Sequence, residues 1–261
     1  MASGLLDTAY NNIYPIVIGK IFSASTLGFY TRAQHFAQLP SSNLTGIIQR
    51  VTFPVLSKLQ NDDDRLRHDY RKLLKMSAFI IFPMMCLLAA VAKPLVVILI
   101  GQKWEFSSVL LIPISLQLMW YPIHEINLNL LQVKGRSELF LRLEIIKKIL
   151  GVTVLCLSIP FGIIFMCYSA IANSILCLII NIYYTGKLIN VGFIRQMRDL
   201  SGIIFLSLSL FALVLIGGSF IGNNWIWLLG GCAFGTVYYL GVAKLLRFDE
   251  LKTAIEIFKK Q

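Results

Sequence analysis

Charged side chains are scarce in this 261-residue chain, where they make up 14% of the residues while 57% are hydrophobic. Soluble domains carry about a quarter charged residues and slightly less than half apolar residues. The shortage of charge therefore excludes a soluble globular protein, and the mean hydropathy of +0.73 excludes an intrinsically disordered one. The composition predicts an all-α fold, a polytopic bundle of transmembrane helices.

The chain also lacks the short motifs that indicate catalysis or a metal site. It contains no GxSxG, HExxH or P-loop pattern, and its five cysteines form no CxxC pair or Cys/His cluster. All five cysteines lie within apolar runs, which is typical of small core residues. We therefore expect no enzymatic activity, no metal ion and no cofactor.

One acidic run needs separate consideration, because aspartate-rich loops hold magnesium pyrophosphate in intramembrane prenyltransferases. Asp62, Asp63 and Asp64 form such a run, but a prenyltransferase needs a second aspartate-rich loop facing the first. The expected loops on the same side hold only isolated acids such as Asp199. The run instead predicts the N-terminal end of a helix that continues through Arg67, since acids stabilise that end.

Apolar runs divide the chain into about eight expected membrane spans. The uncharged stretch 149–186 must contain two of them, because one helix of that length would reach about 57 Å, almost twice the hydrocarbon core. We place the break at Ile159–Gly162, which contains Pro160, and we expect Pro94 to Trp104 to lie at the interface. The expected spans are Leu5–Phe22, Leu39–Leu59, Leu73–Ala92, Ser107–Val133, Leu139–Ile159, Ile163–Lys187, Gly202–Ile221 and Trp225–Leu246.

The basic residues are distributed unequally between the two ends of these spans. Three alternate loops and the C-terminal tail hold 19 of the 24 lysines and arginines. Basic loops stay on the cytoplasmic side of a membrane. Both termini are therefore expected to be cytoplasmic, and the uncharged turns at Pro160 and Gly222 are expected to lie on the opposite side.

Arg50 lies within an expected span, where a charge costs at least about 2.5 to 3.5 kcal/mol and needs a partner or a water-filled cavity. It shares a helical face with Asn43, and Gln49 belongs to a neighbouring polar stripe. Two interpretations remain open. Arg50 either pairs with Asp7 or Glu125 and fastens helices together, or it faces a cavity that receives a substrate.

Two further polar clusters also allow two interpretations each. Lys147 and Lys148, near the start of the span 139–159, either extend to the cytoplasmic interface or form a basic entrance for an anionic headgroup. Glu125 belongs to a polar stripe of the span 107–133, with His124 beside it. These two residues either relay protons or join helices by polar packing.

Three segments of the sequence resemble a known family. They are LGFYTRAQ (27–34), LPSSNLTGIIQRVTFPVLSKLQ (39–60) and INLNLLQVKGRSELFLRLEIIKK (126–148). They are similar to the Wzx-type lipopolysaccharide and polysaccharide exporters of bacteria, within the multidrug/oligosaccharidyl-lipid/polysaccharide flippase superfamily. The resemblance is strong over 3–187 and weaker towards the C-terminus.

The resemblance implies one half of a two-lobed flippase. Family members surround a central cavity with two lobes, and this chain resembles the second lobe with its trailing helices. The implied divisions are a six-helix bundle (1–187), a cytoplasmic linker (188–200), two additional helices (201–246) and an amphipathic tail (247–261). A first-lobe partner chain or self-association would complete the cavity.

The resemblance also implies a function, namely translocation of a polyprenyl-pyrophosphate-linked oligosaccharide across the bacterial inner membrane. Other expected contacts are with membrane lipids, and nucleic acid is not expected as a partner. The alternatives are an ion-coupled small-molecule exporter, which needs an acidic and partly apolar cavity, and a membrane scaffold that does not transport. The substrate-binding residues expected from this resemblance are Arg50, Asp7, Asn11, Asn12, Asn43, Gln49, Lys147 and Lys148.

Overall fold

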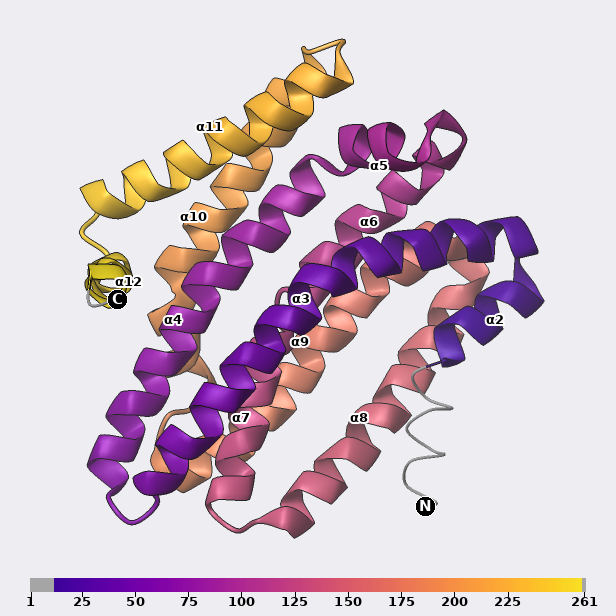
Figure 1. The fold of residues 1–261 in the computed structure, drawn as a ribbon. Helices are drawn as coiled ribbons and strands as arrows, with labels where there is room; N and C mark the ends of the chain where they lie inside the picture. The colour runs from indigo at the N-terminus through magenta and orange to yellow at the C-terminus, as the bar shows by residue number, and fades with distance from the viewer. Residues whose placement is uncertain (1–11, 260–261) are drawn as a thin grey trace.

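The computed structural model describes residues 12–259, and all regular secondary structure in that range is helical (Figure 1). The predicted class, an all-α bundle of membrane helices, is confirmed. The elements are α2 (Ile13–Ile21), α3 (Ala24–Lys58), α4 (Asp63–Ala90), α5 (Ala92–Ile100), η1 (Gln102–Trp104), α6 (Glu105–Leu118), α7 (Tyr121–Val133), α8 (Ser137–Ser158), η2 (Ile159–Phe161), α9 (Gly162–Ile189), α10 (Phe193–Ser219), α11 (Asn224–Leu245) and α12 (Asp249–Lys259).

The expected count of eight spans is not confirmed. Within residues 12–259, five segments are long and apolar enough to cross a membrane. The polar side chains of α3 lower its hydropathy, so that α3 is not among them. Of the first expected span, residues 5–11 lie outside the described residues, and the described part contains the nine-residue helix α2. The five segments are Asp63–Ala90, Gln102–Val133, Glu138–Ile189, Phe193–Ser219 and Asn224–Leu245.

The segment Glu138–Ile189 contains two helices, as the sequence predicts. Helix α8 ends at Ser158, the turn η2 contains Pro160, and α9 begins at Gly162. Gly162 has a φ of +89°, a conformation that glycine adopts without steric cost. The chain reverses there, and α9 returns alongside α8 (Figure 1).

Other helix boundaries differ from the sequence-based expectation. The expected span Ser107–Val133 consists of two helices, α6 and α7, with Pro122 in the first turn of α7. Proline fits that position because an N–H in the first turn has no partner within the helix, so that the N–H which proline lacks is not needed there. The expected loop before Leu73 is largely the first part of α4, and the predicted cap is confirmed, because Asp62 accepts a hydrogen bond from the Arg65 amide at 3.1 Å.

Helix α4 is central to the bundle. It packs against α3, α6 and α7 on one side and against α10, α11 and α12 on the other. Its buried side chains include Leu74, Ile81, Phe82 and Met85. Helices α3, α7 and α8, between which the candidate site described below lies, all precede α10 in the chain (Figure 1).

Candidate functional site

A cavity of about 430 Å³ lies between α3, α7 and α8. Its wall combines amides, carboxylates and apolar side chains. The lining residues are Gln49, Phe53, Glu125, Leu128, Asn129, Gln132, Phe140 and Glu144.

Helix α7 supplies one polar wall of this cavity. Glu125, Asn129 and Gln132 are spaced four and three residues apart, which places them on one helical face. Glu125 accepts a short hydrogen bond from the Gln49 amide, and this contact joins α7 to α3. The amide nitrogen of Asn129 is buried and has no hydrogen-bond partner within the described part of the chain. Asn129 therefore holds a buried donor without a partner in the wall of the cavity.

Helix α8 supplies a carboxylate together with a lysine that neutralises it. The Lys147 ammonium donates a short hydrogen bond to the Glu144 carboxylate, three residues earlier on the same helix. Both side chains are partly buried. Lys147 does not line the cavity, but its ammonium holds the Glu144 carboxylate, which does. Lys148, the next residue, is half-buried.

Arg50 follows Gln49 on α3, but its side chain is exposed and does not line the cavity. Within residues 12–259 it forms no ion pair, and Glu125 bonds to Gln49 in its place. The hypothesis that Arg50 pairs with Glu125 is therefore wrong. Asp7, the other partner considered for Arg50, lies outside the described residues.

The remaining expected site residues are not gathered in one place. Asn12 and Asn43 are exposed and do not line the cavity, and Asn11 lies outside the described residues. The structure thus brings Gln49 to the cavity wall and places Lys147 one hydrogen bond away from it.

His124 and Glu125 are adjacent in the sequence but contact different helices. The two ring nitrogens of His124 lie 3.1 Å from the Ser174 hydroxyl and 3.1 Å from the Asn181 amide, both on α9. Glu125 faces α3. These contacts favour polar helix packing over a proton relay between the two side chains.

Sequence reasoning left several cavity residues out of the expected site. The α7 stripe was considered either for a proton relay or for polar packing, and Glu144, Phe53 and Phe140 were not among the expected site residues. A useful signal was present in the polar stripes of 39–59 and 117–132. Polar stripes on two expected spans indicate a shared wet surface, because each stripe costs free energy when it faces lipid.

Comparison with known proteins gives a consistent family. Residues 1–109 match the family described as polysaccharide biosynthesis protein. An uncharacterized membrane protein in the cps region of Klebsiella pneumoniae is 32% identical over 158 residues, which cover 59% of this chain and 32% of that protein. The lipopolysaccharide biosynthesis protein WzxC of Escherichia coli K12 is 33% identical over 104 residues, covering 40% of this chain and 21% of its own length.

Two further similarities extend the comparison. The teichuronic acid biosynthesis protein TuaB of Bacillus subtilis is 29% identical, over 53% of this chain and 29% of its own length. The lipid II flippase MurJ, in an inward closed conformation, aligns with a TM-score of 0.72 over 95% of this chain and 55% of that structure, at 17% identity, and so shares the fold. The matches thus span about a third or less of the curated relatives. The resemblance seen in the sequence is confirmed, because residues 1–109 are similar to the family described as polysaccharide biosynthesis protein and two relatives are named for lipopolysaccharide and teichuronic acid biosynthesis.

Proposed function

We propose that this chain takes part in moving a polyprenyl-pyrophosphate-linked oligosaccharide across the bacterial inner membrane for surface polysaccharide biosynthesis. The proposal rests chiefly on the amide-rich cavity between α3, α7 and α8, in a fold shared with a lipid flippase. The names of two relatives, which refer to lipopolysaccharide and teichuronic acid biosynthesis, support the same substrate class.

The chemistry of the cavity suits a saccharide. Gln49, Asn129 and Gln132 offer both donors and acceptors to sugar hydroxyls. Phe53 and Phe140 provide apolar surface for the faces of sugar rings. The polyprenyl tail can remain in the surrounding lipid while the polar part occupies the cavity.

Arg50 is proposed to hold the pyrophosphate. Its guanidinium is exposed next to the cavity residue Gln49, and a guanidinium can donate two parallel hydrogen bonds to phosphate oxygens. The wider binding surface that we propose also includes Asn12, Asn43, Lys147 and Lys148, together with Asp7 and Asn11 from outside the described residues.

The proposal also includes a second unit that covers the exposed polar face of α3. Ser42, Asn43 and Arg50 are exposed on α3, and polar groups in hydrocarbon cost several kcal/mol each when they lack partners. We propose that a first-lobe partner or a second copy of the chain covers this face. The chain then acts as one half of a flippase.

One observation favours the alternative of an ion-coupled small-molecule exporter. The cavity contains two carboxylates, Glu125 and Glu144, beside apolar Phe53, Leu128 and Phe140. Such a mixture suits a cationic or proton-coupled substrate. Against this alternative, the negative charge of Glu144 is already balanced by Lys147, and Glu125 is engaged by Gln49.

The test measures surface glycan in a strain that lacks its polysaccharide flippase and expresses the full chain with a first-lobe partner. We expect Arg50→Gln to reach the membrane at the normal level and to abolish export, with Arg50→Lys restoring it only partly because two-pronged bonding is lost. Asn129→Leu should lower export without lowering the protein level, since the Asn129 amide nitrogen has no partner to lose.

Lys58→Gln is the matched control, because Lys58 is also an exposed cation of α3 and lies away from the cavity. Normal export by both Arg50→Gln and Asn129→Leu would refute the site. Cation-dependent uptake of a small molecule, with no effect on glycan, would support the exporter alternative.

A further inference from the structure

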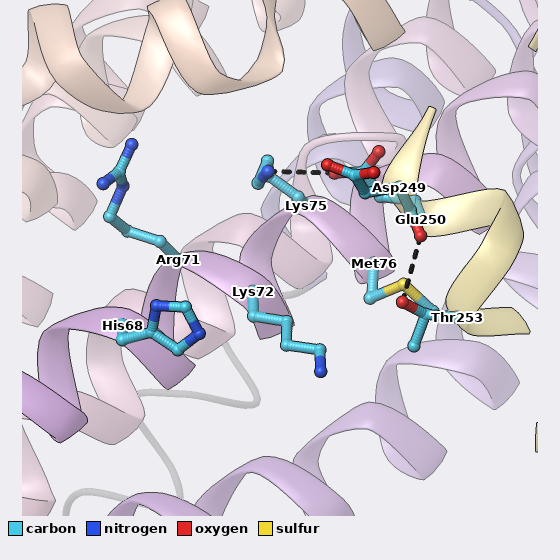
Figure 2. A pocket seen from close by; sticks show the side chains of 8 residues that line it. All are labelled: His68, Arg71, Lys72, Lys75, Met76, Asp249, Glu250 and Thr253. Atoms are coloured by element: carbon cyan, nitrogen blue, oxygen red, sulfur yellow. Dashed lines mark hydrogen bonds and ion pairs between the residues drawn. The ribbon is translucent and has the colours of Figure 1, made fainter. Parts of the chain in front are cut away.

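A second cavity, of about 330 Å³, lies between the first part of α4 and the C-terminal helix α12 (Figure 2). Four of its lining residues come from one face of α4, and they carry nitrogen donors: His68, Arg71, Lys72 and Lys75. Met76 adds an apolar edge, and α12 contributes Asp249, Glu250 and Thr253. This cavity shares no residue with the one between α3, α7 and α8.

The position of the cavity along α4 corresponds to a membrane interface. Residues 63–75 of α4 include nine aspartate, arginine, lysine or histidine side chains, whereas residues 76–90 include none. Lys75 therefore marks the level at which α4 enters an apolar environment. One turn beyond Met76, Ile80 is 47% exposed, so an apolar surface continues from the cavity along α4.

Most charges around the cavity already have partners. The Lys75 ammonium lies 3.1 Å from the Glu250 carboxylate, and Arg71 donates two hydrogen bonds of 2.6 Å to Asp199 on α10. Asp249 accepts from Lys252 at 3.3 Å. These pairs neutralise the acids that lie closest to the cavity.

Lys72 and His68 are different. They lie four residues apart on α4, both are exposed, and neither forms a hydrogen bond or ion pair within residues 12–259 (Figure 2). The two acids that line the cavity, Asp249 and Glu250, are paired with other cations. Asp69, three residues before Lys72 on α4, makes no ion pair with it, so that the Lys72 ammonium has no ion-pair partner within residues 12–259. The cavity thus offers a positive charge and a ring N–H to an anion, at the level of lipid headgroups.

We propose that this cavity binds the phosphate of an anionic glycerophospholipid, with Lys72 and His68 as its donors. The acyl chains would follow Met76 and Ile80 along α4, which a free phosphate cannot exploit. The lipid is a resident ligand that bridges α4 and α12, separate from any transported molecule. This assignment does not depend on the proposed transport function.

The test is native mass spectrometry of the full chain in detergent, titrated with phosphatidylglycerol or phosphatidylcholine. We expect one phosphatidylglycerol to bind in preference to phosphatidylcholine, and Lys72→Gln to weaken it about fivefold, as the loss of one interfacial cation implies. Lys72→Arg should retain the binding because the charge remains. Adding His68→Gln to Lys72→Gln should weaken it further.

Lys58→Gln is the control, since it removes another exposed lysine at the same end of the bundle but outside this cavity. Circular dichroism checks that each variant is folded. Equal phosphatidylglycerol binding by wild type and Lys72→Gln would overturn the proposal, as would equal binding of phosphatidylcholine. Lys72-dependent binding of inorganic phosphate as tight as that of phosphatidylglycerol would identify a free-phosphate site instead, and would also overturn it.

Discussion

Tyr70, Asn127 and Gln196 are buried polar side chains on α4, α7 and α10. The Tyr70 hydroxyl donates to the Asn127 side-chain oxygen at 2.9 Å, and the Asn127 amide donates to the Ile123 carbonyl at 2.8 Å. Gln196 donates to the Val191 carbonyl at 3.1 Å. Because buried polar groups need specific partners, these contacts define how the three helices align.

We expect Tyr70→Phe to lower the free energy of unfolding by about 1 to 3 kcal/mol, since it removes a donor from a buried acceptor. Thermal unfolding in detergent, followed by circular dichroism, measures the change. Tyr121→Phe is the matched control, because the Tyr121 side chain is exposed. Equal stability of Tyr70→Phe and wild type would show that the buried hydroxyl contributes nothing.

Sequence reasoning identified Arg50 and Gln49 as unusual polar residues within a span, but it could not identify their partners. Which side chain meets Gln49 depends on how α3 and α7 are rotated against each other, and periodicity within one helix does not contain that information. Glu125 was therefore considered, beside Asp7, as a partner of Arg50, although Gln49 is the residue that reaches it.

At the level of helices, α10 and α11 approach each other closely at Gly218, where α10 has no side chain. A Cβ atom on Gly218 of α10 would lie 1.8 Å from the Trp227 indole nitrogen of α11. At Gly217, one residue earlier, a Cβ would meet nothing within 4 Å. The two adjacent glycines therefore differ only in what faces them.

Gly218→Ala is expected to destabilise the protein by about 1 to 3 kcal/mol, because Trp227 must move and its packing is strained. Gly217→Ala should instead be neutral or stabilise it by up to about 1 kcal/mol, since alanine is the better helix former. The difference between the two melting temperatures measures the effect. Similar melting temperatures for both variants would contradict the close contact.

A break between two helices was predictable where the sequence contains proline and glycine together, whereas the first and last residues of the other helices were not. Pro160 and Gly162 correctly marked the turn between α8 and α9. Pro122, inside the expected span Ser107–Val133, lies instead in the first turn of a new helix. The start of α4 was predicted from the acidic run that caps it, but its continuity with the expected span from Leu73 was not. The start of α10 was missed because hydrophobic runs report depth in the membrane, and this helix begins before its apolar run.

For the whole molecule, the all-α membrane fold and the family resemblance were predictable from composition and motifs. The arrangement of the candidate cavity was not, because it depends on how α3 packs against α7 and α8, which lie far from α3 in the sequence. Orientation rests on the distribution of basic residues and stays a prediction.

The predicted orientation places Asn61 on the cytoplasmic side and Gly222 on the opposite side; both residues are exposed in connections between helices. In a background where Cys156 and Cys232 are changed to serine, a membrane-impermeant maleimide should label Gly222→Cys in right-side-out vesicles. It should label Asn61→Cys only in inverted vesicles. The reverse labelling pattern would invert the orientation.

The length of α4 affects how the trailing helices are attached. Its 28 residues extend about 42 Å at 1.5 Å per residue, beyond a hydrocarbon core of about 30 Å. The pairs of Arg71 with Asp199 and Lys75 with Glu250 lie in the charged first part of α4, where the two cations are 37% and 33% exposed and the two carboxylates 11% and 8%. Screening weakens partly exposed ion pairs but not apolar contacts. Raising the ionic strength should weaken the attachment of α10 and α12 to the start of α4, while the apolar contacts between α4 and α10 further along the helices remain.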